Sequence, residues 1–276
     1  MRFTSKIVFL SITLASVVGI ASAQQPMPVP NVGFKISFQP AETFRGTQIY
    51  RQADNLAYAY ETDHAAADAD GAPNAYHPND LNKRCTKDPH VGLDCPANAG
   101  YPNASWWKEV LVPDPDNPSK AFVQPSGPFK GFFVAMTSLR KPHGDQTDPS
   151  TYVDATQFPY VVIPSGFGAL PHVAAQGDVG VATHLESGKM TTFIVGDSGG
   201  GSDAKLGEAS IALYAALGFP NANPRTGSGL PRGKIQYIIF PGSHRQGAVF
   251  GLGQTKTYTI RRWTSSRTHP GSSRLT

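Results

Sequence analysis

The sequence has little cysteine, few amphipathic helical patterns and no long apolar run after its first 23 residues. Its two cysteines, with His90 between them, make a poor case for a zinc site. No later stretch is long enough to span a membrane. The glycine-rich run at 199–201 lacks the lysine and Ser/Thr of a phosphate-binding loop. We therefore expect no metal and no cofactor.

Glycine and proline are abundant, with 28 and 24 residues in a chain of 276. Together with the scarcity of helical patterns, this composition favours many short strands and loops. Alternation predicts a strand at 34–38, and apolar runs predict buried strands at 132–137, 159–164 and 235–241. The expected fold is mainly β, a barrel-like or β-rich α+β domain, with one helix packed on its side. The sequence does not specify the order of the strands.

Residues 1–23 have the pattern of a secretory signal peptide. A basic start with Arg2 and Lys6 precedes the apolar run 7–20, and Ala21-Ser22-Ala23 offers a cleavage site. A membrane anchor is the alternative, but the run is short for a span. We expect a secreted protein, extracellular or periplasmic, monomeric and free of the membrane once the signal is removed. In that setting Cys85 and Cys95 are expected to form a disulfide.

Four segments follow from these patterns. They are the signal peptide 1–23, a proline-rich lead with a first strand at 24–50, a main domain at 51–254, and a basic, flexible tail at 255–276. The net charge of +4 depends on the ends: two basic residues lie in the signal and five in the tail. The remaining 17 basic residues stand against 20 acidic ones. This acidic balance argues against a nucleic-acid partner and suits a cationic substrate.

Residues 176–218 read as a strand, a turn, a second strand, a glycine-rich loop and a helix. The strands are predicted at 179–185 and 191–195 as a hairpin, and the helix from Glu208 to Gly218. Asp197 follows the second strand, and Glu208 begins the helix. The loop between them can bring both carboxylates to one rim, an arrangement that suits general acid and base chemistry.

An acidic and aromatic cluster occupies residues 56–80. Its candidate sugar-binding residues are Asp68, Asp70, Tyr76 and His77, and Trp106 is a further candidate for stacking on a sugar ring. The DADG run is not an EF-hand, because Asn79 stands where the bidentate glutamate belongs. A turn-rich, solvated loop and a partly buried tryptophan pair are the alternative interpretations.

The segment GDSGG at 196–200 matches the nucleophile segment of chymotrypsin-like peptidases, with Ser198 as the nucleophile. The context differs from that family, because the nearest upstream histidine is His184 in the same hairpin. A nucleophile elbow would need its helix directly after the serine. A secreted serine peptidase therefore remains an alternative function.

The runs FIVGDSGG, LGEASIAL and YIIFPGS resemble the fungal-type chitosanases, glycoside hydrolase family 75, and their bacterial relatives. The segments 151–164 and DADGAPNAYHP are similar to those of bacterial members. The resemblance implies an endo-acting hydrolase of chitosan, the β-1,4-linked glucosamine polymer, with inversion at the anomeric carbon. It places the essential pair on Asp197 and Glu208. We expect Glu208 to be the general acid and Asp197 the base, with Asp68 and Asp70 binding substrate ammonium groups. A non-catalytic polysaccharide-binding protein is the other alternative.

Overall fold

The computed structural model describes residues 37–246. The predicted signal peptide, most of the proline-rich lead and the basic tail lie outside this range. So does most of the strand predicted at 34–38, of which only the last two positions are described. The first strand of the structure begins at Phe38 and continues to Phe44.

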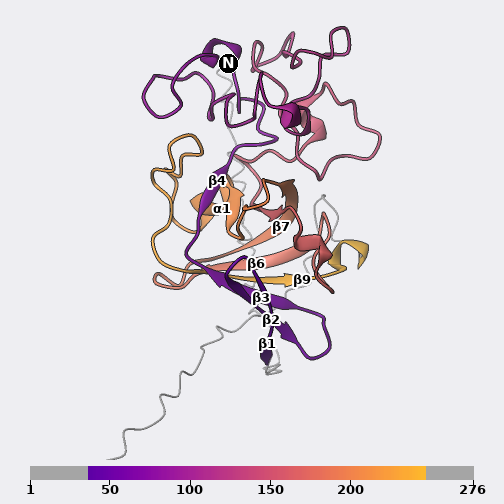
Figure 1. The fold of residues 1–276 in the computed structure, drawn as a ribbon, viewed down its shortest axis with the longest axis vertical. Helices are drawn as coiled ribbons and strands as arrows, with labels where there is room; N and C mark the ends of the chain where they lie inside the picture. Colours follow the sequence, from indigo (N-terminus) through magenta and orange to yellow (C-terminus); the bar gives the residue numbers. More distant parts are fainter. Residues whose placement is uncertain (1–36, 247–276) are drawn as a thin grey trace, which may run out of the picture. The chain divides into compact units, whose positions relative to one another are not determined.

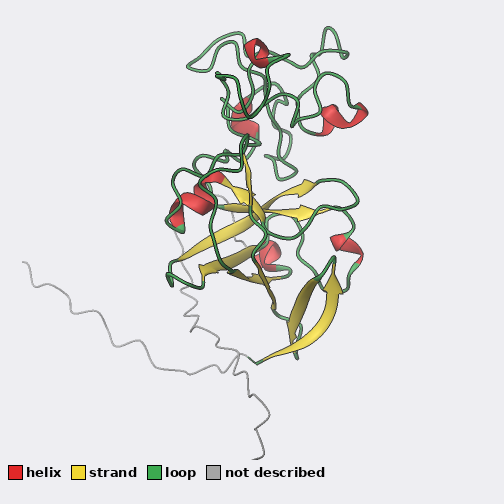
Figure 2. Ribbon diagram, turned by 60° about the vertical axis from the view of Figure 1, so that its left-hand side comes forward, coloured by secondary structure: helices red, strands yellow, loops and turns green. Residues whose placement is uncertain are grey.

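The described chain forms one mixed sheet of nine strands in the order β1-β2-β3-β9-β6-β7-β5-β8-β4. The strands are β1 (Phe38–Phe44), β2 (Thr47–Gln52), β3 (Tyr58–Thr62), β4 (Ala66–Asp68), β5 (Tyr160–Pro164), β6 (Val179–His184), β7 (Met190–Gly199), β8 (Glu208–Ser210) and β9 (Ile235–Phe240). The pairs β5–β7 and β4–β8 are parallel, and the others are antiparallel. The mainly β prediction is confirmed, and the sheet, drawn in yellow in Figure 2, is open rather than closed into a barrel. Its two edge strands are β1 and β4, which are labelled in Figure 1.

Two apolar cores cover the two faces of the central strands. Val161, Val195 and Ala209 belong to the first core, whereas Tyr160 and Val162 belong to the second. Because both faces are covered, β5 is buried at all five positions, and the continuous apolar run YVVIP is what such a strand requires. The strands predicted at 159–164 and 235–241 are confirmed to within one residue at each end.

The hairpin of β6 and β7 is also confirmed, with Thr183 opposite Met190 next to the turn. The second strand is longer than predicted, since β7 continues through Asp197 to Gly199. The predicted helix start is wrong. Glu208 begins the short strand β8, and the helix α1 covers only Ile211–Ala216. The local reason is that Ser210 caps α1 by accepting a hydrogen bond from Leu213 N at 3.1 Å.

A long irregular segment, residues 69–159, joins β4 to β5 (Figure 1, indigo to pink). It contains the short 3₁₀ helices η1 (Pro78–Asp80), η2 (Ser105–Glu109) and η3 (Pro149–Thr151). Two further 3₁₀ helices, η4 (Phe167–Ala169) and η5 (Ser243–Gln246), lie outside it. The strand predicted at 132–137 is wrong, because Phe133 and Ala135 form only isolated bridges. Their side chains join the second core, which explains the apolar run.

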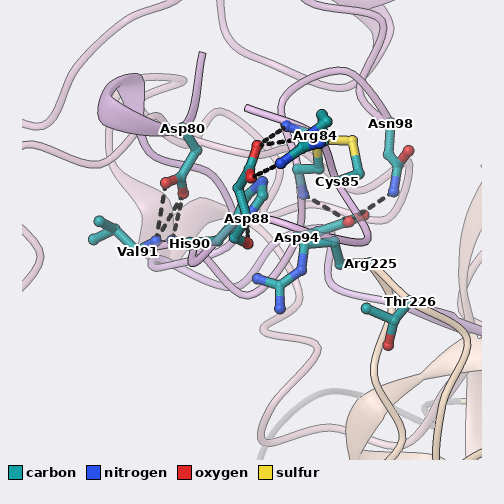
Figure 3. The surroundings of a disulfide bond; sticks show 12 residues. Asp80, Arg84, Cys85, Asp88, His90, Val91, Asp94, Asn98, Arg225 and Thr226 are labelled. Atoms are coloured by element: carbon teal, nitrogen blue, oxygen red, sulfur yellow. Dashed lines mark hydrogen bonds and ion pairs between the residues drawn. A yellow bond between two sulfur atoms is a disulfide. The ribbon is translucent and has the colours of Figure 1, made fainter. Parts of the chain in front are cut away.

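The disulfide between Cys85 and Cys95 is present and closes a turn-rich loop in this segment (Figure 3). The buried carboxylate of Asp80 accepts hydrogen bonds from Val91 N and Gly92 N at 2.8–3.0 Å. Asp94 accepts from Cys95 N and from the Asn98 side chain. In this loop, carboxylate oxygens accept the hydrogen bonds of backbone N–H groups that have no partner strand. None of the helices within residues 37–246 is long and apolar enough to cross a membrane.

Candidate active site

The position of Asp197 depends on an irregularity in the pairing of β7 with β5. Val161 lies opposite Val195, but Val162 lies opposite Asp197, so Gly196 is an extra residue in β7. In a regular strand Val195 and Asp197 would share a face. The bulge moves Asp197 to the other face, beside Val162 and the second core. A Cβ on Gly196 would lie 2.6 Å from the Cβ of Tyr160, so this position requires glycine.

Glu208 reaches the same face from the opposite side of β5. Val161 pairs with Ala209 in the antiparallel pairing of β5 with β8. In an antiparallel pair the next residue of one strand lies opposite the preceding residue of the other, so Glu208 lies beside Val162. Asp197 and Glu208 therefore flank one valine across three adjacent strands. Two strand spacings separate their Cα atoms, which is about 10 Å. The two carboxylates project from the same face of the sheet.

Asp68 and Asp70 bring further carboxylates to this face. Asp68 ends β4, where it lies opposite Ser210 in the parallel pairing with β8. The buried hydroxyl of Tyr160 donates to Asp68 Oδ2 at 2.9 Å and also lies 3.0 Å from the backbone oxygen of Asp70. Carboxylate oxygens of Asp68, Asp70 and Asp197 all lie within 4.8 Å of one another. Such a group could hold a cation, whether a metal ion or an ammonium group.

One oxygen of Asp197 accepts three hydrogen bonds. Ser138 donates to Oδ1 from its backbone N at 2.8 Å and from its hydroxyl at 2.7 Å, and Ser198 N donates at 2.7 Å. The described residues donate no hydrogen bond to Oδ2, nor to either carboxylate oxygen of Glu208. Asp197 therefore carries donors that favour its ionised form, whereas Glu208 does not.

Burial raises the pKa values of all four carboxyl groups. For Glu208, burial and the negative charges of Asp68 and Asp197 raise the pKa to about 8. For Asp197, burial and the charge of Asp68 raise the pKa to about 7, against the opposing effect of the Ser138 hydrogen bonds. Burial raises the pKa of Asp68, and burial together with the charges of Asp68, Asp197 and Asp94 raises that of Asp70 well above its ordinary value. At neutral pH this arrangement supplies a protonated acid next to an ionisable base.

A comparison with known protein families shows which family the chain belongs to. Residues 65–268 match the family model described as fungal chitosanase of glycosyl hydrolase group 75. The chain belongs to this family. A search of curated proteins found no match.

The residues that match the chitosanase family model include Asp68, Asp70, Asp197 and Glu208, which the fold brings together. Tyr76 is buried, and its hydroxyl donates to Asp70 Oδ1 at 2.7 Å. It therefore holds an acidic residue of the site rather than presenting a ring to solvent. His77 caps η1 by accepting from Asn79 N at 3.0 Å, and its ring packs edge-on against Phe132.

Trp106 is 45% exposed on η2, whereas its neighbour Trp107 is buried in the second core. The pair therefore divides into one core residue and one solvent-facing ring. Within residues 37–246, no hydrogen bond joins Trp106 to the four carboxylates, so its role in sugar binding stays a prediction. An exposed ring of this kind has the surface that stacking on a sugar requires.

The surroundings of Ser198 do not fit a serine peptidase. Its hydroxyl lies 2.8 Å from the hydroxyl of Ser138. His184 lies beside the turn of the hairpin, at the opposite end of β7, and its ring nitrogens contact Ser187 and the backbone oxygen of Arg232. Within residues 37–246, no histidine is hydrogen-bonded to Ser198. The peptidase alternative is disfavoured because the chain belongs to a chitosanase family and because no described histidine lies in position to take a proton from Ser198.

Sequence reasoning missed three residues that shape the site. Ser138 precedes Asp197 by 59 residues and lies in an irregular segment with no pattern to mark it. Tyr160 was recognised only as the start of a buried strand. Asp94 is buried beside the disulfide (Figure 3). Burial raises its pKa to about 6, and its charge contributes to raising the pKa of Glu208.

Proposed function

We propose that this chitosanase-family protein is a secreted, endo-acting hydrolase that cleaves β-1,4 glucosaminyl linkages of chitosan with inversion. The observation that carries the proposal is the placement of Asp197 and Glu208 on one face of the sheet, flanking Val162. An inverting pair needs carboxyl groups about 6.5–9.5 Å apart, with room for a water molecule. A Cα separation of about 10 Å is compatible with that spacing.

The two carboxyl groups take different roles in this proposal. Glu208, with a pKa of about 8, is protonated at neutral pH and donates its proton to the glycosidic oxygen as the C–O bond breaks. Asp197 removes a proton from a water molecule, which attacks the anomeric carbon from the opposite side. The three donors on Asp197 Oδ1 keep this group ionisable despite its burial, and Oδ2 remains for the water.

Asp68 and Asp70 support the choice of a cationic sugar. Burial raises the pKa of both groups, and for Asp70 the neighbouring charges of Asp68 and Asp197 raise the pKa further. A substrate ammonium group within this cluster would offset the repulsion, and the neutral acetamide of chitin would not. We therefore propose that Asp68 and Asp70 bind the amino group of a glucosaminyl unit.

Secretion forms part of the proposal for three reasons. Residues 1–23 have the basic, apolar and small-residue regions of a signal peptide. The Cys85–Cys95 disulfide suits an oxidising compartment. A polymer such as chitosan would also have to be met outside the cytoplasm.

The test is to incubate the purified chain with soluble chitosan, chitin, cellulose and casein, and to follow chain length and reducing ends. We expect rapid shortening of chitosan alone. Proton NMR of the first products should show the α-anomer. Binding of chitosan without shortening would indicate the non-catalytic alternative, and a β-anomer as first product would contradict inversion.

A further inference from the structure

A loop of residues 200–207 connects β7, which carries Asp197, to β8, which begins at Glu208. These two strands lie on opposite sides of β5, so the loop must cross the end of β5. We call it the crossing loop. It contains three glycines, which accept many backbone conformations. The position of Glu208 therefore depends on what holds this loop in place.

Both ends of the crossing loop are held by hydrogen bonds from neighbouring elements. Ser165, the residue after β5, donates from its backbone N to Gly199 O at 2.9 Å. Its hydroxyl donates to Gly200 O at 2.7 Å. At the other end, the buried hydroxyl of Tyr214 on α1 donates to Gly207 O at 2.5 Å. The middle of the loop, from Gly201 to Lys205, needs a separate anchor.

Arg45 supplies that anchor. Its Nη1 donates to Ala204 O and, at 3.4 Å, to Gly201 O. Its Nη2 donates to Ser165 O at 2.6 Å. In the described part of the chain, no other side chain donates to the middle of the crossing loop. One guanidinium, with its rigid fork of donors, therefore fastens the loop to the end of β5.

The guanidinium of Arg45 is oriented by the hairpin of β1 and β2. Arg45 and Gly46 form its two-residue turn, with φ angles of 45° and 85°, as a type I′ turn requires. The guanidinium carbon lies 4.7 Å from the centroid of the Phe44 ring, and that ring packs edge-on against Phe167 of the first core. The family match begins at residue 65. Arg45 therefore reaches the crossing loop from outside the matched range.

We propose that Arg45 is a positioning residue, which fixes the crossing loop and thereby the place of Glu208 relative to Asp197. The inference rests on the proposed chitosanase function and adds to it a dependence on the β1–β2 hairpin. Within the described residues, no hydrogen bond or ion pair joins Arg45 to either carboxylate, so it acts through the loop backbone. Misplacing a reacting group by about 1 Å can cost roughly 100-fold in rate.

The first experiment measures kcat and KM on soluble chitosan. Arg45→Ala should lower kcat by about tenfold or more, while KM stays within about threefold, because the proposed amino-group binders lie in other segments. Arg51→Ala is the matched control: Arg51 lies in the same hairpin but bonds Glu42 and the backbone oxygen of His172. It should keep near-parental kcat. Arg45→Lys should restore part of the lost kcat, since an ammonium group reaches fewer of the carbonyls.

The pH profile distinguishes lost positioning from lost stability. Burial raises the pKa of Glu208 to about 8, and so do the charges of three neighbouring carboxylates, those of Asp68, Asp197 and Asp94. A loosened loop admits water to Glu208, so its pKa falls and the alkaline limb of kcat/KM moves to lower pH in Arg45→Ala. Removing the positive charge alone would move this limb to higher pH, because a nearby cation favours the ionised carboxylate. An alkaline limb that stays in place or rises would contradict the proposal.

Hydrogen exchange followed by mass spectrometry adds a readout that needs no substrate. Peptides covering the crossing loop should exchange faster in Arg45→Ala than in the parent, and at the parental rate in Arg51→Ala. If Arg45→Ala does not fold, Arg45→Lys takes its place, with smaller changes expected in the same directions.

The outcomes separate this inference from the proposed function. If the parent cleaves chitosan and Arg45→Ala matches Arg51→Ala in kcat, pH profile and exchange, Arg45 is not a positioning residue and the function stands. If the parent fails to cleave chitosan, the function falls and hydrogen exchange decides the role of Arg45. Faster exchange confined to the crossing loop then supports the anchor, and unchanged exchange overturns it.

Discussion

At the residue scale, Ser138 influences the pKa of Asp197 through two hydrogen bonds. Its backbone N and its hydroxyl both donate to Asp197 Oδ1, and both bonds favour the charged carboxylate. They counteract the burial that raises the pKa of Asp197. Ser138 is therefore a positioning residue for the proposed base, acting through Asp197 rather than on the substrate.

Ser138→Ala removes the hydroxyl donor and should raise the pKa of Asp197 above its value of about 7. The lower limb of the pH profile of kcat/KM should then move to higher pH, with most of the loss at low pH and recovery above it. Ser138→Thr, which keeps the hydroxyl, should restore the parental profile. The measurement is kcat/KM on soluble glucosamine oligomers from pH 5 to 9. A uniform loss at every pH would mean that Ser138 has only a structural role.

At the residue scale, the sequence pointed to Asp197 and Glu208 as the candidate pair because motifs carry them. It also allowed Asp68 and Asp70 to be chosen as acidic neighbours, and the fold brings all four together. It could not reveal Ser138, since hydrogen bonds between segments 59 residues apart leave no local pattern. The same holds for Tyr160, whose hydroxyl reaches Asp68 across 92 positions.

At the scale of elements, the bulge in β7 decides which face of the sheet carries Asp197. The hairpin and the strands β5 and β9 were predictable, because alternation and apolar runs are local signals. The bulge was not, because it appears only in the pairing with β5. The short strand β8 was mistaken for a helix start because its pairing with β4 involves a segment some 140 residues away.

Gly196→Ala tests the role of the bulge. The added Cβ would lie 2.6 Å from the Cβ of Tyr160, so β7 or β5 must shift. Because Asp197 adjoins Gly196, we expect kcat to fall by at least tenfold. Gly199→Ala, in the same strand with open space around its Cβ, is the control and should keep near-parental kcat. Thermal unfolding checks that both variants fold, and parental kcat in folded Gly196→Ala would show that the bulge geometry is unimportant.

At the scale of the whole molecule, the buried carboxyl groups of the candidate site make the folding stability depend on pH. Carboxyl groups with raised pKa values bind more protons in the folded state than in the unfolded state at pH 5–8. Folding stability from these groups is therefore lost as the pH rises through that window. Asp80 and Asp178 have lowered pKa values. The folding stability that they contribute is lost only at more acidic pH, as these carboxylates become protonated.

Glu208→Gln should consequently unfold at about the parental temperature at pH 5 and at a higher one at pH 8. The expected gain at pH 8 is roughly 2–4 °C for each kcal/mol of relieved charge burial in a chain of this size. Glu186→Gln, at an exposed position, should show no pH-dependent gain. Differential scanning calorimetry at the two pH values measures this. A constant difference at both pH values would contradict the raised pKa of Glu208.

The central claim is that two carboxylates, and not a serine, break the polymer. It is tested most directly by kcat on soluble chitosan for Asp197→Asn, Glu208→Gln, the double variant, Ser198→Ala and the parent, with circular dichroism to check folding. We predict losses of about 10²–10⁴-fold for each single carboxylate change. The double variant should lose far less than their product, because the two groups act as a unit. Ser198→Ala should stay within about tenfold, since among residues 37–246 its hydroxyl is hydrogen-bonded only to Ser138. An inactive Ser198→Ala beside a near-parental Glu208→Gln would contradict the account.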